Sequence, residues 1–215
     1  MTTLYPHFHG EIKENKYVAE VLRSYFPDYS YKGVFFDIGA FDPIEISNSY
    51  HFEQNGWDCY LFEANPDLIP NLQSKRAHVY NYALYDTDKE QTTFHVVHNG
   101  TWTAGFSAIE LSADYEKRFP CNTKTIKTVQ VPQKKLNTVL ASELPHIKNI
   151  DIMSIDIEGG ELKMLQGFDL QTYGPKVIVI ENALNDSAYK KYLESYGYTL
   201  DQHISYNQYY VKTSS

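Results

Sequence analysis

Hydrophobic residues along this chain gather in short runs that alternate with amphipathic stretches. The runs are GVFFDI at 33–38, CYLFEA at 59–64, HVYNYAL at 78–84, IDIMSIDI at 150–157 and KVIVIEN at 176–182. Runs of strand length that are apolar on both faces, separated by helical segments, are typical of a parallel sheet covered by helices on both sides. The pattern therefore predicts an α/β fold.

Two helix starts follow the first two predicted strands. Asp42, Pro43 and Glu45 stand in the order of a capping box, with proline at the position where its missing N–H costs nothing. Asn65 and Pro66 repeat the arrangement after the second strand. We expect helices to begin at Pro43 and at Pro66.

The pattern changes between about residues 92 and 131. There TTFHVV and TIKTVQV alternate like half-exposed strands and flank a long irregular stretch, which is often functional. We expect an inserted hairpin with a substrate loop at 92–131, N-terminal covering helices at 1–33 and a closing antiparallel hairpin at 196–212. The 215 residues contain no linker, so a single domain over 1–215 is expected. A lid over the substrate would come from the insert or from another subunit.

Composition and charge exclude several classes of protein. The net charge is −8 without a Lys/Arg cluster, which argues against nucleic acid as the partner. No apolar run approaches the roughly 20 residues of a membrane helix, so we expect no membrane insertion. The N-terminus does not read as a signal peptide, and Cys59 and Cys121 form no spaced pair. We expect a reducing, cytoplasmic compartment.

The ends of the predicted strands carry the candidate ligand-binding residues, because open parallel sheets bind ligands beyond the carboxyl ends of their strands. Gly39 lets the backbone turn close to a ligand, and Glu63 stands where an acid accepts both hydroxyls of a ribose. Together they indicate an adenosine-containing ligand. Asp42 and Glu45, at the start of the next predicted helix, would repel the pyrophosphate of a dinucleotide.

S-adenosylmethionine is a nucleoside ligand that carries an amino acid and no phosphate. Its cationic sulfonium and ammonium groups would be favoured by Asp37, Asp42 and Asp156. Alternatively, Asp37 only ends a strand and Asp42 only caps a helix. Asn48 would bind the amino-acid end of the cofactor, unless it merely lies on an exposed helix face.

Several motifs match one family in order. FFDIGAFDPIEISNSYHFEQNGWDCYLFEANP, then NYAL, then LNTVL followed by IDIMSIDIEGGELKMLQGF resemble the FkbM-type S-adenosylmethionine-dependent methyltransferases. The resemblance runs from about Val34 to Asn182 and departs at Pro43, where the family usually has glycine. It implies a Rossmann-like methyltransferase fold with a mostly parallel seven-stranded sheet. It also implies cofactor contacts along the matched loops, at Gly39, Ala40, Glu63, Ala64 and Ala83.

The resemblance implies methyl transfer, commonly to an oxygen and often on a sugar, with a deoxysugar such as rhamnose as one candidate. Asp156, Glu181 and Asn182 close the last two predicted parallel strands, and their oxygens form a hard ligand set suited to Mg²⁺ or Mn²⁺. This layout resembles catechol O-methyltransferase. Alternatively, Asp156 touches the cofactor, Glu158 is the general base and Glu181 is structural.

The insert supplies three further candidates. His98 would act as a base, and Trp102 and Phe106 would stack on a sugar face, although each has a packing role as the alternative. The sequence thus predicts an O-methyltransferase that acts on a sugar or glycan hydroxyl, alone, as a homo-oligomer or within a larger multidomain protein. One alternative is a cofactor- or carbohydrate-binding domain of a glycan-synthesis protein without turnover. The other, an NAD-dependent oxidoreductase, is disfavoured by the missing second and third glycines.

Overall fold

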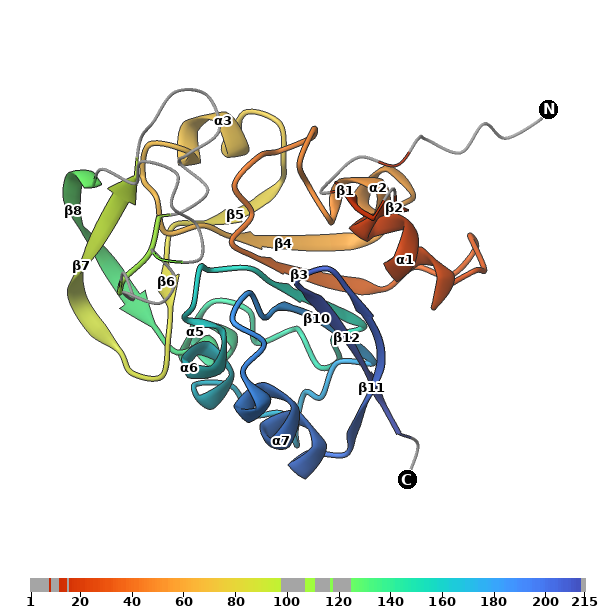
Figure 1. The fold of residues 1–215 in the computed structure, drawn as a ribbon. Coiled ribbons are helices and arrows are strands. Elements are labelled where there is room, and N and C mark those ends of the chain that lie inside the picture. Colours follow the sequence, from red (N-terminus) through yellow and green to blue (C-terminus); the bar gives the residue numbers. More distant parts are fainter. Residues whose placement is uncertain are drawn as a thin grey trace.

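A seven-stranded sheet forms the centre of the molecule (Figure 1). The computed structural model describes residues 8, 12–14, 16–97, 107–110, 117 and 125–213. The sheet has the order β11-β12-β10-β9-β3-β4-β5. Its strands are β3 (Val34–Ile38), β4 (Asp58–Phe62), β5 (His78–Tyr80), β9 (Ile152–Ile155), β10 (Val177–Glu181), β11 (Tyr198–Ile204) and β12 (Asn207–Lys212).

The pairing directions confirm the predicted topology. The five strands from β10 to β5 pair in parallel, and β12 is antiparallel to both of its neighbours, so β11 and β12 form the predicted C-terminal hairpin. From β3 the chain adds β4 and β5 on one side and later adds β9 and β10 on the other. The switch point between β3 and β9 is where such sheets bind ligands. The fold is the Rossmann-like α/β fold expected from the sequence.

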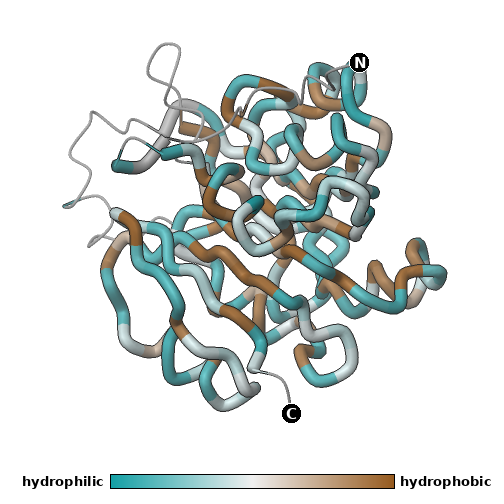
Figure 2. Tube along the Cα trace, turned by 90° about the vertical axis from the view of Figure 1, so that its right-hand side faces the viewer, coloured by the Kyte–Doolittle hydropathy of each residue, from teal (hydrophilic) through white to brown (hydrophobic). Residues whose placement is uncertain are grey.

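Helices cover both faces of the sheet because successive strand residues point to opposite sides. In β3, Phe35 packs into a core with α1 (Val18–Ser24), α2 (Tyr50–Gln54) and α3 (Ile69–Gln73). Its neighbour Phe36 belongs to the opposite core, with α5 (Leu136–Ser142), α6 (Glu161–Gln166) and α7 (Ser187–Ser195). Figure 2 accordingly shows hydrophobic stretches of the chain passing through the middle of the molecule. Each fully buried phenylalanine contributes about 1.5–3 kcal/mol.

Two smaller sheets complete the described chain. β6 (Ala83–Leu84), β8 (Thr125–Lys134) and β7 (Lys89–Val97) form a three-stranded sheet in which β7 and β8 are antiparallel. These two long strands are the arms of the predicted inserted hairpin. β1 (Ile12–Lys13) and β2 (Lys16–Tyr17) pair just before α1, the helix that the described part of 1–33 contains. Among the described residues, no helix has the length and apolar character needed to cross a membrane.

The predicted helix starts at Pro43 and Pro66 are wrong. α2 begins only at Tyr50 and α3 at Ile69, and the residues between each strand and its helix form turns. The capping geometry is nevertheless present, because Asp42 Oδ1 accepts hydrogen bonds from the N–H groups of residues 44, 45 and 46 at 2.8, 2.6 and 3.4 Å. The capped turn is not continued as a helix.

A buried polar network explains why the turn does not continue. The Arg76 guanidinium donates to the carbonyl oxygen of Pro43 at 2.8 Å and to the hydroxyls of Ser47 and Ser49 at 2.9 Å, and it pairs with Glu53. Both serines are fully buried. The segment before α2 is therefore held by a side chain that is distant in sequence.

We predict that Arg76→Met lowers the free energy of unfolding by about 3–5 kcal/mol, because it leaves buried polar partners without their cation. Lys127→Met is the matched control, since Lys127 and its partner Asp67 are both about half exposed. It should cost less than about 1 kcal/mol. Urea denaturation of both variants measures the two losses. Equal losses would contradict a structural role for the network.

Candidate functional site

An open cleft lies at the carboxyl ends of β3, β4 and β9, at the switch point of the sheet. It encloses about 700 Å³ of empty space, including the part open to solvent. Its walls come from the loops after these three strands, from β6 and from residues 107–110 beside β7. The lining includes the sequence-predicted residues Gly39, Glu63, Ala64, Ala83, Asp156 and Glu158.

Gly39 has the conformation and the close approach that its predicted role requires. Its φ is +85°, and a Cβ built on it would lie 1.8 Å from the backbone oxygen of Asp156. Any side chain there would push apart the loops after β3 and β9. Glycine is the residue that avoids both the collision and the strain of a positive φ.

Glu63 lies buried at the end of β4 and holds the neighbouring loop. One carboxylate oxygen accepts the N–H of Phe41 at 3.0 Å, and the other accepts the N–H of Asn65 at 2.7 Å. Burial raises the pKa of the Glu63 carboxyl. Each carboxylate oxygen has a second lone pair, so the group can also accept hydroxyls from a ligand in the cleft.

The N–H groups of the loop after β3 have acceptors inside the protein. Gly39 and Ala40 donate to the carbonyl oxygen of Phe62 at 2.9 and 3.2 Å, Phe41 donates to Glu63, and residues 44–46 donate to Asp42. A helix or loop N-terminus binds phosphate only when its N–H groups are available. In this loop, the carboxylates of Asp42 and Glu63 accept N–H groups that a bound phosphate would otherwise use.

Four of the predicted cofactor residues lie outside the lining of the cleft. Asp42 caps its turn, which was the alternative considered for it, and Ala40 packs into the core beside α2. Asp37 is buried, accepts a 2.5 Å hydrogen bond from the Ser49 hydroxyl, and has a pKa raised by burial. Asn48 donates to the Ser154 hydroxyl at 3.2 Å, and its Oδ1 is buried without a hydrogen-bond partner among the described residues.

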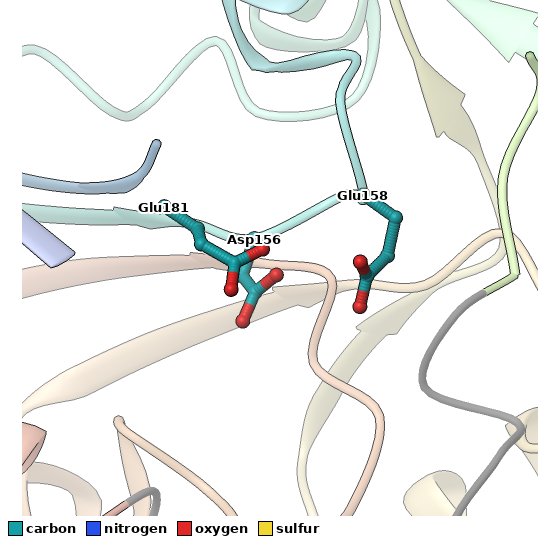
Figure 3. A group of neighbouring side chains, drawn as sticks. All are labelled: Asp156, Glu158 and Glu181. Atoms are coloured by element: carbon teal, nitrogen blue, oxygen red, sulfur yellow. The ribbon is translucent and has the colours of Figure 1, made fainter. Parts of the chain in front are cut away.

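Three carboxylates meet at one side of the cleft (Figure 3). One oxygen each of Asp156, Glu158 and Glu181 lies within 4.8 Å of the others. Asp156 follows β9 and Glu181 ends β10, the neighbouring strand, so the parallel pairing brings them together. The prediction from the sequence that Asp156 and Glu181 lie close together is thus correct. For Glu158 the sequence suggested the alternative role of general base.

Asn182, the third predicted ligand, uses its side chain elsewhere. Its Oδ1 accepts the N–H of Asp186 at 2.8 Å, and its amide nitrogen donates to the carbonyl oxygen of Asp186 and to Gln208. The amide thus fixes the turn before α7. The structure brings Glu158 to the two acids in place of Asn182.

Glu161 explains how Glu158 reaches the cluster. Its buried carboxylate accepts the N–H groups of Ile157 and Gly159 at 3.1 and 2.9 Å and the Tyr189 hydroxyl at 2.8 Å. Burial raises the pKa of Glu161. The bonds fold residues 157–160 into a tight loop in which Glu158 has a φ of +62°.

The remaining sequence predictions fall on the insert. His98, Trp102 and Phe106 lie outside the described residues. The described piece 107–110 is tied to β7, where Ala108 and His95 exchange backbone hydrogen bonds of 2.9 and 3.2 Å.

Sequence reasoning missed several lining residues, among them Phe41, Tyr82, Tyr85 and Glu110. Phe41 has a φ of +46°, a conformation that is uncommon for an aromatic residue and that the sequence does not reveal. Tyr82 belongs to the NYAL motif and Tyr85 directly follows it, so this motif was the available signal for both tyrosines. Glu110 lies in the irregular insert, where the sequence shows no hydrophobic periodicity from which the orientation of a side chain could be predicted.

Comparison with known proteins identifies the family. A model described as the methyltransferase FkbM domain matches residues 37–200, more than half of the chain. No curated protein matches the chain in sequence. Among solved structures, precorrin-6y C5,15-methyltransferase from Geobacter metallireducens GS-15 is similar at 16% identity, with 96% of this chain and 95% of that chain covered and a TM-score of 0.45. The chain belongs to the FkbM methyltransferase domain family, and it is an S-adenosylmethionine-dependent methyltransferase.

Proposed function

We propose that the enzyme transfers the methyl group to a hydroxyl of a sugar or glycan, with a divalent cation held by Asp156, Glu158 and Glu181. The observation that carries this proposal is the group of three carboxylates at the edge of the cleft. Three negative charges this close repel one another unless a cation or protons neutralise them. An all-oxygen set suits Mg²⁺ or Mn²⁺, which keep positions for water or for substrate oxygens.

The cofactor fits the other end of the cleft. Glu63 would accept the ribose hydroxyls, while Ala64, Ala83 and the rings of Tyr82 and Tyr85 offer an apolar slot for the adenine. Asp156, which lines the cleft, would favour the positive ammonium and sulfonium groups of the cofactor. When bound, S-adenosylmethionine supplies a methyl group on a positively charged sulfur.

The protein's own residues would position the acceptor and remove its proton. A sugar hydroxyl is a poor nucleophile until a base or a cation lowers its pKa. Glu158 lines the cleft and can accept the proton, directly or by holding the cation beside Asp156. The aromatic ring of Phe41, which lines the cleft, offers a face on which a sugar ring can lie. Methyl transfer is otherwise a matter of alignment, which the fixed loops of the cleft favour.

We predict that Glu63→Gln weakens binding of S-adenosylhomocysteine about tenfold, since hydrogen bonds to a charged group are worth about 1.5–3 kcal/mol. Isothermal titration with this ligand and with its 2′-deoxy analogue isolates the ribose contact. The wild-type protein should lose affinity for the deoxy analogue, and the variant should lose much less. Asp67→Asn, which changes an exposed acid outside the cleft, is the control. Equal losses in both proteins would remove the ribose assignment.

We predict that Asp156→Asn and Glu181→Gln each weaken Mn²⁺ binding about tenfold or more, because each removes one charged ligand. Electron paramagnetic resonance of free Mn²⁺ measures the affinity without requiring turnover. The affinity should rise with pH, since protons compete for the same carboxylates. Glu194→Gln, on the exposed face of α7, should change nothing. Methyl transfer that survives exhaustive chelation would exclude the cation from the reaction.

A further inference from the structure

The loop after β9, which carries Glu158, has an uncommon backbone conformation. Glu158 has a φ of +62° and Gly159 a φ of +99°. Both values lie in the region that residues other than glycine seldom adopt, because the Cβ atom crowds the backbone there. A glutamate keeps such a conformation only where the surrounding structure fixes it. The position of Glu158 in the cleft therefore depends on whatever holds this loop.

The buried carboxylate of Glu161 holds the loop. One of its oxygens accepts the N–H groups of Ile157 and Gly159 at 3.1 and 2.9 Å, on either side of Glu158. Its other oxygen accepts the Tyr189 hydroxyl at 2.8 Å. Tyr189 is buried, and burial followed by the Glu161 charge raises its pKa, so its hydroxyl donates at neutral pH. A buried carboxylate keeps its place and its charge only while such donors surround it.

The helix that carries Tyr189 is also tied to the strand that ends in Glu181. The Asn182 Oδ1, directly after β10, accepts the N–H of Asp186 at 2.8 Å, and Asp186 in turn caps α7. Tyr189 lies in the first turn of this helix. The start of α7 therefore contacts both the end of β10, with Glu181, and the support of the loop that carries Glu158.

We propose, on the basis of the proposed function, that Tyr189 is a positioning residue for the cation: its hydrogen bond to Glu161 holds Glu158 beside Glu181. Neither Tyr189 nor Glu161 belongs to the described lining of the cleft, so Tyr189 acts through other residues and not on the ligands. Without the hydroxyl, the Glu161 carboxylate loses a donor and its fixed orientation. Glu158 then relaxes toward a negative φ, and its carboxylate leaves the group of three.

Mn²⁺ titration of Tyr189→Phe tests this role, because the variant keeps the ring and loses only the hydroxyl. Its Mn²⁺ affinity, measured by electron paramagnetic resonance, should fall about tenfold, since partners behind a metal ligand commonly contribute about 10- to 100-fold. Tyr192→Phe is the matched control on the same helix, because its hydroxyl donates to the carbonyl oxygen of Leu165 at 3.1 Å. The control should keep the wild-type Mn²⁺ affinity. Both variants should bind S-adenosylhomocysteine as the wild type does, which shows that the cleft is folded.

A double-mutant cycle shows whether Tyr189 acts through Glu158. Glu158→Ala removes the ligand and should weaken Mn²⁺ binding about tenfold or more. Adding Tyr189→Phe to this variant should cause less than about a twofold further loss, because no Glu158 carboxylate remains to be positioned. Losses that simply multiply would mean that the two residues act independently.

Three results would overturn the positioning role: wild-type Mn²⁺ affinity in Tyr189→Phe, an equal loss in Tyr192→Phe, or multiplied losses in the double variant. Failure of the proposed function looks different. Wild-type Mn²⁺ affinity in Glu158→Ala would remove Glu158 from the cation site, and the positioning role with it. A loss in Glu158→Ala without a loss in Tyr189→Phe would remove the positioning role alone.

Discussion

The loop after β3 bonds its backbone N–H groups to acceptors of the protein itself, mainly the carboxylates of Asp42 and Glu63, and the rest of the site depends on this constraint. Asp42 accepts three N–H groups of the following turn, and Glu63 accepts those of Phe41 and Asn65. A phosphate bound here would have to displace these carboxylates and would meet their negative charge. Glu63, which lines the cleft, favours a ligand that carries hydroxyls.

A second constraint joins the cofactor end of the cleft to the reacting end. Gly39 and the backbone oxygen of Asp156 approach so closely that the loops after β3 and β9 form one surface. Glu161, beneath the second loop, turns Glu158 toward Asp156. Parallel pairing of β9 with β10 then brings Glu181 to the same point. The positions of the three carboxylates are thus set by the strand pairing of the sheet and by the buried carboxylate of Glu161. Their geometry is therefore rigid.

Strands and strand ends could be predicted because buried parallel strands are apolar on both faces and ligands bind at their carboxyl ends. The start of α2 could not be predicted, because Ser47 and Ser49 bond to Arg76, which lies far along the chain. The group of three carboxylates was predicted only in part for a similar reason. Sequence order gives the end of a strand, but it does not reveal that the Asn182 amide fixes the turn at Asp186.

We expect the cleft to bind a sulfonium cofactor and to reject a dinucleotide, and crystal structures of the complexes test this choice. Crystals grown with S-adenosylhomocysteine should show its ribose hydroxyls at Glu63 and its amino-acid end directed toward Asp156. Crystals grown with NAD should show no dinucleotide in the cleft. NAD bound with its pyrophosphate against Gly39, together with an empty cleft in the crystals grown with S-adenosylhomocysteine, would contradict the claim.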